Sequence, residues 1–438
     1  MRLKKVLSVG FTMALAASVL IGCSTKDGAE KTEEGVTTIE FWAAPNPTQE
    51  AYWKEIAKEF EGENPDIKVN VSPMKESPTS EAGIQSALAA KQAPTLSENI
   101  NRGFAAQLAD SKALVPLNEL SGWDDVITSR NMTETIKSWE FSDGNQYVLP
   151  IYSNSMLFGW RLDILKELGF DEAPKTYSEV IDVTKKLKEK YPDKYLWAKT
   201  DLADPTAWKR WFDFYMLYNA ASDGNSFIEG NEFVGDKEAG LQVLSFVDEL
   251  REEKGLLTRE VTDPFETGVG IFTDLGPWTF SYWDEKFPEM KYNENFTLAL
   301  PPVPNGMDPE QAKTFADTKG LVMYASATKE QQEAAMKFIQ WVYSNPENDM
   351  KWLEKTNLPP ARDDLAENEE FKAFMEANPV LQPYAEAVPL GVPPMDNPKF
   401  NELQTYIGQH AFNKVVNGEI TPEQGWEDMK KAIEGDLE

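Results

Sequence analysis

The chain is nearly devoid of the side chains on which nucleophilic catalysis and zinc binding depend. Among 438 residues there is one cysteine, Cys23, and one histidine, His410. A Ser-His-Asp triad needs a histidine beside its nucleophile, and structural zinc sites draw on several cysteines or histidines at once. The sequence therefore predicts no catalytic residue, no metal site and no cofactor, and it indicates a protein that is not an enzyme.

Carboxylates leave one catalytic alternative open. Glycosidases need only two of them, about 5–10 Å apart across a glycosidic bond. The chain has 73 acidic residues, but no fixed spacing singles out such a pair. A secreted enzyme of polysaccharide breakdown therefore stays as an alternative function.

Composition bounds the partners and the size of the fold. The formal charge is −30, and it becomes −33 when the three cations of the first 22 residues are set aside. A surface this negative repels nucleic acid, so we expect none as a partner. The chain is longer than one ordinary domain and 41% hydrophobic, which predicts two lobes with packed cores.

The first 22 residues have the pattern of a secretory signal. Three cations within the first five residues precede an apolar stretch over residues 6–21, which is short for a membrane span of about 20 apolar residues. The run Leu20-Ile21-Gly22-Cys23 resembles the end of a bacterial lipoprotein signal peptide. We therefore predict lipid attachment at Cys23 and a flexible tether over residues 23–35; the alternative is an ordinary signal peptide with a bystander cysteine.

The folded chain is predicted to begin at Val36 and to alternate strands with helices. Residues 37–42 alternate as in a strand, an amphipathic helix runs from about Thr48 to Asn64-Pro65, and residues 67–71 form a second strand. Strand, helix and strand with short connections make a βαβ unit. Such a unit implies a parallel sheet covered by helices.

Capping patterns mark further helix starts, and short apolar runs between them predict strands. Each pattern places a hydroxyl before a helix and a Glu or Gln three residues later, at Thr176-x-x-Glu179, Thr328-x-x-Gln331, Ser344-x-x-Glu347 and Thr421-x-x-Gln424. The predicted strands lie at residues 148–151, 298–300 and 320–324. The alternation predicts the α/β class.

Five short segments spread over the chain carry a resemblance to a known family. They are Ile39-Glu40-Phe41-Trp42 with Phe60 and Asn64-Pro65; Ala93-Pro94-Thr95 with residues 113–117; residues 147–150 with 157–163 and Leu168-Gly169; Phe272 with Gly276-Pro277-Trp278; and Lys319-Gly320 with Phe338-Ile339 and Asn345-Pro346-Glu347. The set resembles extracellular solute-binding protein family 1 of ABC importers, in the carbohydrate-binding branch related to maltose-binding protein. The chain departs from the family at Pro94-Thr95, usually Pro-Asp, and at Trp160-Arg161-Leu162, usually Tyr-Asn-Lys.

The resemblance implies an α/β, two-lobed fold like that of periplasmic binding proteins, each lobe a sheet flanked by helices, with a hinged cleft between them. By chain order we predict one lobe from residues 36–149 plus 314–362. The other lobe is predicted from residues 150–313 plus 363–438. Pro150 lies at the predicted crossing, and its fixed φ suits the end of a hinge.

The cleft of such a protein must suit a sugar, which presents apolar faces and a rim of hydroxyls. Its receptor needs aromatic rings beside short polar side chains. Open α/β sheets bind ligands at the carboxyl ends of their strands. We therefore predict ligand contacts from residues that follow strand ends or the crossing: Trp42, Asn46, Glu98, Asn99, Asn101, Arg102, Tyr152 and Asn154.

The resemblance implies four further ligand contacts. Asp204-Pro205-Thr206-x-Trp208 resembles an acid-Pro loop that contacts ligand in the relatives of maltose-binding protein, and Gly276-Pro277-Trp278 resembles a loop whose tryptophan stacks on a sugar. Residues 395–400 fall where those relatives place another aromatic platform. The implied residues are Asp204, Trp208, Trp278 and Phe400, and the alternative for each tryptophan is a place in a core.

The resemblance thus implies a lipid-anchored receptor outside the cell membrane. It would capture an oligosaccharide or related sugar and deliver it to the permease subunits of an ABC transporter, and we expect it to be a monomer. A further alternative keeps the clamp and changes the ligand to a polyol, a sugar phosphate or a polyamine. Arg102 favours an anionic sugar, whereas Glu98 and Asp204 favour a cation or a neutral sugar.

Overall fold

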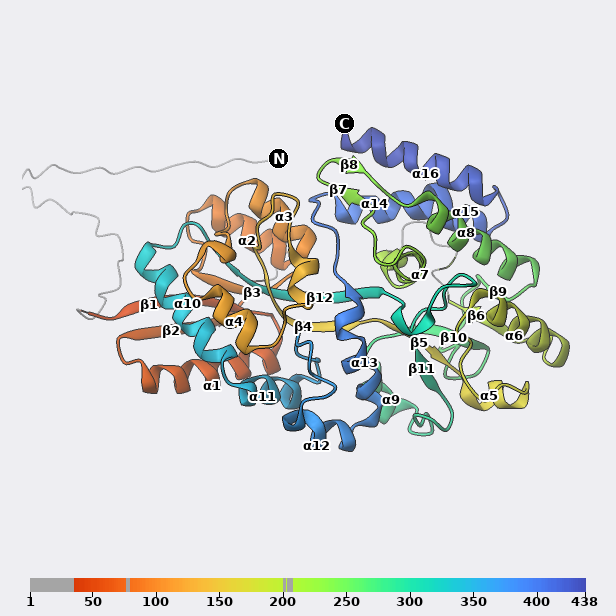
Figure 1. The fold of residues 1–438 in the computed structure, drawn as a ribbon, viewed down its shortest axis with the longest axis horizontal. Coiled ribbons are helices and arrows are strands. Elements are labelled where there is room, and N and C mark those ends of the chain that lie inside the picture. Colours follow the sequence, from red (N-terminus) through yellow and green to blue (C-terminus); the bar gives the residue numbers. More distant parts are fainter. Residues whose placement is uncertain (1–34, 76–78, 200–201, 203–207) are drawn as a thin grey trace, which may run out of the picture. The chain divides into compact units, whose positions relative to one another are not determined.

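The strands of the protein fall into two main sheets. The computed structural model describes residues 35–75, 79–199, 202 and 208–438 (Figure 1). In that part of the chain the first sheet has the order β13-β12-β3-β1-β2, with β4 paired to β12, and the second has the order β11-β5-β10-β6-β9. The strands of the first sheet are β1 Thr37–Ala43, β2 Ile67–Pro73, β3 Leu96–Ile100, β4 Leu149–Ser155, β12 Thr314–Met323 and β13 Gly391–Val392; those of the second are β5 Leu157–Trp160, β6 Tyr195–Ala198, β9 Leu256–Leu257, β10 Gly270–Leu275 and β11 Thr297–Ala299; β7 Ile228–Glu229 and β8 Glu232–Phe233 form a separate pair.

The first lobe is built on the predicted βαβ unit. Alternate residues of β1, among them Ile39 and Phe41, are fully buried, and β1 pairs in parallel with both β2 and β3. The intervening helix, α1 (Pro47–Glu63), begins one residue before the predicted start because Pro47 takes the first helical position. It ends at Asn64, as predicted.

Two antiparallel strands join the lobes. Strand β4 runs directly into β5 of the second sheet, with only Met156 between them, and β12 pairs with β4 along most of its length. At one end β12 pairs with β3, and at the other it pairs with β13. Pro150 lies near the start of β4, in the crossing strand, as predicted.

A buried cluster of charges holds the start of β4 to the first lobe. The Arg130 guanidinium donates to the carbonyl oxygens of Pro150 and Ile151 and forms an ion pair with Asp349 at 2.9 Å. Arg362 donates to the same aspartate at 3.2 Å. We call Arg130, Asp349 and Arg362 the arginine cluster; their side chains are at most 3% exposed.

Two separate groups of buried apolar side chains form the main cores. One includes Ile39, Phe41, Leu149 and Ile151, and the other begins with Met156 and includes side chains from the second sheet and the C-terminal helices. The change from one core to the other thus falls within residues 152–156. The lobe boundaries predicted from the sequence stay a prediction.

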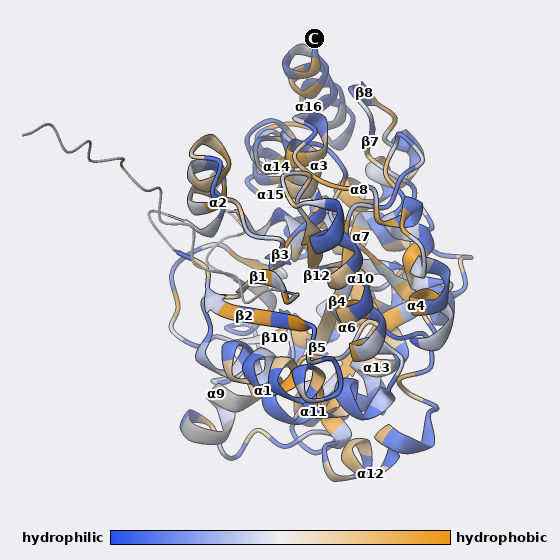
Figure 2. Ribbon diagram, turned by 90° about the vertical axis from the view of Figure 1, so that its left-hand side faces the viewer, coloured by the Kyte–Doolittle hydropathy of each residue, from blue (hydrophilic) through white to orange (hydrophobic). Residues whose placement is uncertain are grey.

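The helices surround these cores. Figure 2 shows α2 and α3 on the opposite side of the first lobe from α1 and α11, as does Figure 1. The helices not yet given are α2 Ser80–Ala89, α3 Arg102–Asp110, α4 Trp123–Ser129, α5 Leu162–Glu167, α6 Tyr177–Lys190, α7 Phe214–Ala221, α8 Lys237–Glu252, α9 Thr279–Lys286, α10 Lys329–Tyr343, α11 Pro346–Thr356, α12 Glu369–Ala377, α13 Gln382–Ala387, α14 Phe400–Ile407, α15 Asn413–Val416 and α16 Pro422–Leu437. Short 3-10 helices include η2 Thr135–Trp139 and η4 Trp208–Trp211.

Three of the four predicted helix starts are confirmed. Thr176 and Thr328 form reciprocal capping boxes with Glu179 and Gln331, and Thr421 accepts a hydrogen bond from the backbone N–H of Gln424. The start at Ser344 is wrong. Ser344 closes α10, and Asn345 caps α11 because Pro346 occupies the first helical position and the Asn345 side chain reaches the N–H of Glu347.

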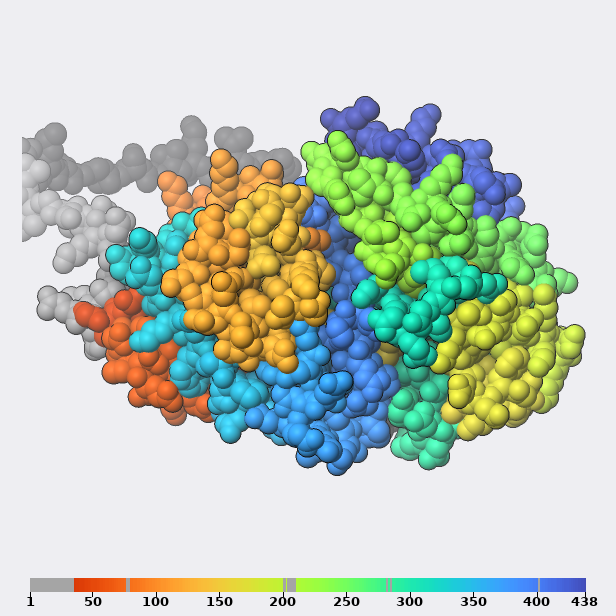
Figure 3. Space-filling view, viewed as in Figure 1, coloured from red at the N-terminus to blue at the C-terminus, as the bar shows by residue number. Residues whose placement is uncertain are grey.

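The chain between α11 and α14 lies in the seam between the lobes. Figure 3 shows this stretch in blue, between first-lobe atoms in orange and second-lobe atoms in green. Its side chains pack with Leu353 of α11 on one side and with Leu157 and Leu275 of the second sheet on the other. No helix in the described ranges has both the length and the apolar character needed to cross a membrane.

Candidate ligand-binding site

The carboxyl ends of β1 and β3 lie side by side, as the sequence predicts for a ligand-binding edge. The two strands are parallel neighbours, with Phe41 opposite Leu96 and Trp42 opposite Ser97. The backbone N–H of Ala44, just past β1, donates to the Glu98 carboxylate at 2.6 Å. Glu98 therefore fixes the loop that carries Asn46.

Strand β3 contains a bulge at this edge. Ser97 pairs with Val322 and Ile100 with Gly320, so Glu98 and Asn99 together lie opposite Leu321. Asn99 adopts a left-handed backbone with φ of 64°, which asparagine tolerates better than most residues. The prediction that Glu98 and Asn99 follow the strand is thus wrong: both lie within it, and the bulge changes the direction of their side chains.

Glu98 is a buried carboxyl with spare hydrogen-bonding capacity. It is 0% exposed, and its Oε2 atom makes no close hydrogen bond. Burial raises the pKa of Glu98 to about 7, although the Ala44 N–H, the Trp53 indole N–H and the nearby Lys319 ammonium all lower it. A buried acceptor without a partner is costly, and such groups occur where a ligand supplies the missing donor.

The two crossing strands add four polar side chains. Asn154 lies opposite Asp317 and Tyr152 opposite Lys319, and residues opposite one another in an antiparallel pair share a face. Asn154 is 2% exposed, and its Oδ1 atom also has no partner. We call Glu98, Tyr152, Asn154, Asp317 and Lys319 the floor cluster.

Electrostatics links the members of the floor cluster. Burial raises the pKa of Asp317, and the Lys319 ammonium opposes that rise. The carboxylates of Asp317 and Glu98 both help to raise the pKa of Tyr152, after burial itself. Two carboxylates thus share one ammonium group.

Asp317 and Lys319 are absent from the predicted ligand contacts. The predicted strand began at Gly320, whereas β12 begins at Thr314. The signal that could have found them is the spacing of two, which places both charges on the face of Phe315 in an otherwise apolar strand.

A row of aromatic rings extends along the second lobe from this face. Phe400 stacks on Trp211 with centroids 4.3 Å apart, and Trp211 lies 5.8 Å from Phe315. Phe212 continues the row, 5.8 Å from Phe315 and 6.3 Å from Trp278. Trp278 is 47% exposed, an unusual fraction for an indole, and the Nε1 atom of Trp211 has no partner.

Phe400 also touches the first lobe directly. A Cβ atom placed on Gly103 of α3 would lie 2.9 Å from the Cβ atom of Phe400, closer than ordinary contacts. Only glycine lets the two helices approach to this distance. Phe400, which the resemblance implied as part of an aromatic platform, is 3% exposed because Trp211 covers one ring face.

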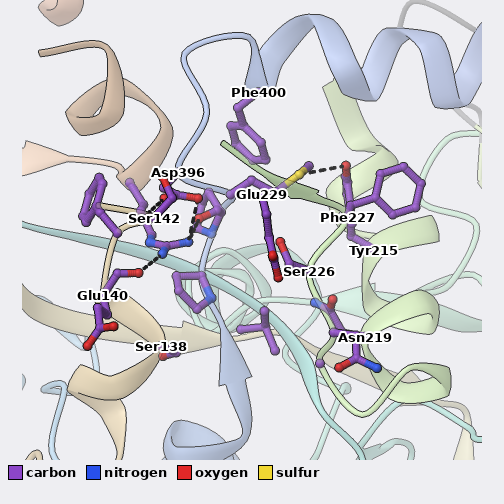
Figure 4. A pocket seen from close by; sticks show the side chains of 18 of the residues that line it. Ser138, Glu140, Ser142, Tyr215, Asn219, Ser226, Phe227, Glu229, Asp396 and Phe400 are labelled. Atoms are coloured by element: carbon purple, nitrogen blue, oxygen red, sulfur yellow. Dashed lines mark hydrogen bonds and ion pairs between the residues drawn. The ribbon is translucent and has the colours of Figure 1, made fainter. Parts of the chain in front are cut away.

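A cavity of about 620 Å³ adjoins the row between the lobes (Figure 4). Glu140, Ser142 and Asp396 lie on one side of it, and Tyr215 and Asn219 on the other, while Glu229 also lines it. Phe315 and Phe400 line it as well, so its wall is continuous with the aromatic row. Its lining of rings, hydroxyls, amides and carboxylates suits a polar ligand with apolar faces.

Arg102 and Asp396 form the rim of this cavity. Arg102 donates to the carbonyl oxygens of Glu140 and of Pro394, the latter at 3.3 Å, and its guanidinium lies 3.8 Å from the Asp396 carboxylate. The backbone N–H of Ser142 donates to the other oxygen of Asp396 at 2.6 Å. The segment around Asp396 is itself held to the second lobe, because the neighbouring Asn397 donates to the carbonyl oxygen of Gly230.

The predicted contacts thus divide into groups. Arg102 and Phe400 line the cavity, Glu98, Tyr152 and Asn154 belong to the floor cluster, and Trp278 ends the aromatic row. Four others lie at the edge of the first sheet outside the cavity lining: Trp42, Asn46, Asn99 and Asn101. Asp204 and Cys23 lie outside the described residues, as does the side chain of Trp208, whose backbone belongs to η4.

Three of the edge residues have structural roles. Asn46 caps α1 and Asn101 caps α3 through their side-chain oxygens. Trp42 is half-buried and packs against the first core. In the described ranges no group of three or more His, Cys, Asp or Glu side chains is placed to hold a metal ion.

A fold of two sheet-containing lobes, joined by crossing strands and meeting at a polar and aromatic face, defines a hinged binding protein. The profile of the bacterial extracellular solute-binding protein family matches residues 55–379. The chain belongs to this family, as its five segments predicted, and it is a solute-binding protein.

Relatives of known structure or function agree with this assignment. The chain is 23% identical over 435 residues to the sn-glycerol-3-phosphate-binding periplasmic protein UgpB of Escherichia coli (strain K12), covering 93% of both chains. It is 60% identical to protein lmo0859 from Listeria monocytogenes EGD-e, with a TM-score of 0.91 over 92% of this chain and 100% of that one. The cyclic alpha-maltosyl-1,6-maltose binding protein from Arthrobacter globiformis, 17% identical, shares the fold with a TM-score of 0.74 over 92% of this chain and 99% of that one. The predicted two-lobed α/β fold is thus confirmed.

Proposed function

We propose that the protein is a lipid-anchored receptor of an ABC importer that captures an oligosaccharide between its lobes without reacting with it. Closure around the solute would convert occupancy into a shape that permease subunits can sense. The proposal includes ligand contacts from the floor cluster, Arg102, Trp278 and Phe400, and, by the resemblance, from Asp204 and Trp208. It places the protein outside the cell, held to the membrane through Cys23, and it takes the protein to be a monomer.

The combination of the aromatic row with the floor cluster carries this proposal. A pyranose ring stacks its C–H face on an aromatic ring and directs hydroxyls sideways to carboxylates and amides. Here Trp278 offers an exposed ring, while Asn154 holds a buried acceptor without a partner and Glu98 holds a buried carboxyl. The maltose-type ligand of the Arthrobacter neighbour is consistent with the same chemistry.

A glycan panel tests the proposal. Thermal unfolding of the purified protein with plant, algal and host oligosaccharides should show at least one glycan that raises the unfolding temperature, because a ligand that binds only the native state stabilises it. Chromatography of the same mixtures should recover every glycan intact. Release of a shorter product would instead support the enzyme of polysaccharide breakdown, and a panel without any stabilising glycan would contradict sugar capture.

The membrane anchor has its own test. Cys23→Ser, or growth with the lipoprotein-processing inhibitor globomycin, should prevent lipid attachment. The variant should then appear in the soluble fraction, whereas the wild type sediments with membranes, because a multiply acylated cysteine holds a protein at a bilayer. A Cys23→Ser protein that still sediments with membranes would contradict the anchor.

The UgpB relative supports a second candidate ligand. That protein binds sn-glycerol 3-phosphate, a phosphorylated polyol, and it matches nearly the whole chain. The same clamp could hold such a solute if Arg102 were available to the phosphate. The charges around Arg102 decide between the two candidates.

A further inference from the structure

We infer that Asp396 makes the interlobe site reject anionic solutes, because it neutralises the one well-buried cation of the cavity wall. This inference rests on the proposed function, since it takes the space between the lobes to be the solute site. It excludes phosphorylated and carboxylated sugars, and it names Asp396 as the residue that excludes them.

The geometry of the rim occupies both terminal nitrogens of the Arg102 guanidinium and leaves its Nε atom without a hydrogen-bond partner. Phosphate recognition by arginine relies on two parallel N–H donors aimed at the anion. Here one terminal nitrogen donates to the carbonyl oxygen of Pro394 and the other to that of Glu140, and the Asp396 carboxylate lies 3.8 Å away. The Ser142 N–H fixes that carboxylate in place.

Burial makes this neutralisation effective. The Arg102 side chain is 12% exposed and that of Asp396 is 8% exposed. Charges shielded from water interact more strongly than exposed ones, and salt screens them less. An incoming phosphate would therefore meet Asp396 at nearly the same distance as Arg102.

The other charges on the cavity wall repel anions. Glu140, Glu229 and Glu232 line the cavity, and none of them forms an ion pair with another described residue. The remaining cation of the lining, Lys137, is 65% exposed and pairs with Glu134 at 2.6 Å. Carboxylates thus outnumber cations around the space that a ligand would fill.

The floor cluster also has more carboxylates than cations. Its one cation, Lys319, acts on both Glu98 and Asp317. A phosphate placed there would face two carboxylates for one ammonium group. Like charges brought together at a desolvated site cost several kcal/mol, so both regions disfavour an anion.

Titration calorimetry with sn-glycerol 3-phosphate tests the inference. The purified full-length wild type should show no binding at millimolar concentrations. Asp396→Asn should gain affinity by about tenfold or more, equivalent to at least about 1.4 kcal/mol, since it frees the Arg102 charge. The gain should weaken as salt is added.

Matched variants separate the local charge from the net charge. Glu427→Gln removes one carboxylate from an exposed pair with Lys237 outside the cavity, and it should behave as the wild type does. The double variant Arg102→Gln/Asp396→Asn should lose the gain, because the cation that would hold the phosphate is gone. Asp396→Ser, which keeps a small acceptor for the Ser142 N–H, replaces Asp396→Asn if unfolding curves show that the latter is not folded.

Three results would overturn the inference: phosphate binding by the wild type at micromolar concentrations, no gain in Asp396→Asn beyond Glu427→Gln, or a gain that survives in the double variant. These outcomes are independent of the glycan panel. A gain of phosphate affinity in Asp396→Asn with no glycan bound would keep the charge inference and reject oligosaccharide capture. Binding of spermidine instead of any glycan would have the same meaning.

Discussion

Two buried groups of charges, the arginine cluster and the floor cluster, touch the same strand, β4, and they differ in how fully their hydrogen bonds are satisfied. Arg130 uses Nε and both terminal nitrogens, donating to Asp349 and to the carbonyls of Pro150 and Ile151. A few residues further along β4, Asn154 leaves its Oδ1 atom without a partner.

This difference in hydrogen bonding distinguishes groups that stabilise the fold from groups that can bind a ligand. A fully hydrogen-bonded buried charge has nothing left to offer a ligand, and removing one partner exposes the other to a large desolvation cost. A buried acceptor without a partner weakens the folded state and gains when a ligand donates to it. We therefore assign the arginine cluster to holding the strand and the floor cluster to holding the solute.

The largest expected effect comes from breaking the arginine cluster. Arg130→Met leaves Asp349 buried with only Arg362 as its cation, so the free energy of unfolding should fall by about 3–5 kcal/mol. Urea unfolding followed by circular dichroism measures it. Lys372→Met, which removes an exposed pair with Glu369, is the control and should change stability by less than about 1 kcal/mol. Equal losses in the two variants would reject the structural role.

The next effect concerns the pH dependence that Glu98 gives the native state. Its folded pKa of about 7 lies above that of an unfolded glutamate, so the native state binds the extra proton between these values. The contribution of Glu98 to stability is therefore present at low pH and is lost as the pH rises through about 7, a change of about 3 kcal/mol.

Glu98→Gln removes this titration while keeping the shape of the side chain. Relative to the wild type, the variant should become more stable by about 3 kcal/mol on going from pH 4.5 to pH 8. Urea unfolding at both pH values measures the difference. If the two proteins show parallel pH profiles, Glu98 is not the buried titrating group that the structure indicates.

A smaller effect, confined to binding, is expected at Asp317. Asp317→Asn should weaken the tightest glycan of the panel by about tenfold, since hydrogen bonds to a charged acceptor are stronger than those to an amide. Stability should change by less than about 1 kcal/mol because the amide keeps the shape of the side chain and removes a charge that burial disfavours. Calorimetry measures the affinity, with Asp66→Asn, in an exposed turn, as control. A loss of stability with unchanged affinity would show that Asp317 stabilises the fold, as the arginine cluster does, and does not bind the solute.

The smallest effect on stability is expected for an aromatic residue of the site, Trp278. Trp278→Ala should alter the free energy of unfolding by about 1 kcal/mol or less, because the ring is 47% exposed. It should nevertheless abolish the ligand-dependent shift in tryptophan fluorescence. Trp341→Ala, in the first lobe, should keep that shift. A shift that persists in Trp278→Ala would remove this residue from the site.

Features set by neighbouring residues were predictable from the sequence. The alternation of β1, the start and end of α1 and the capping boxes at Thr176 and Thr328 each depend on a few adjacent side chains. The predicted helix start at Ser344 was wrong, although it too depends on neighbouring residues. Asn345 followed by Pro346 is the stronger signal for a helix start, and α11 begins there.

Features set by pairing between distant strands were not predictable. The bulge at Glu98 and Asn99 depends on the register with Leu321, more than 200 positions away in the chain. The pairing of Asn154 with Asp317 arises in the same way, so spacing could place Asp317 on one strand face with Lys319 but could not join it to Asn154. The choice of Trp278 and Phe400 came from the family resemblance, which local patterns would not have supplied.

The contact between Gly103 and Phe400 has a mechanical consequence. One residue without a side chain acts as a spacer, and its size sets how near α14 can come to α3. Alanine, serine and valine at position 103 would place progressively larger side chains against Phe400. Each would push the Phe400 ring further from α3 than the one before. The distance between α3 and α14 is therefore expected to depend on the size of the side chain at position 103.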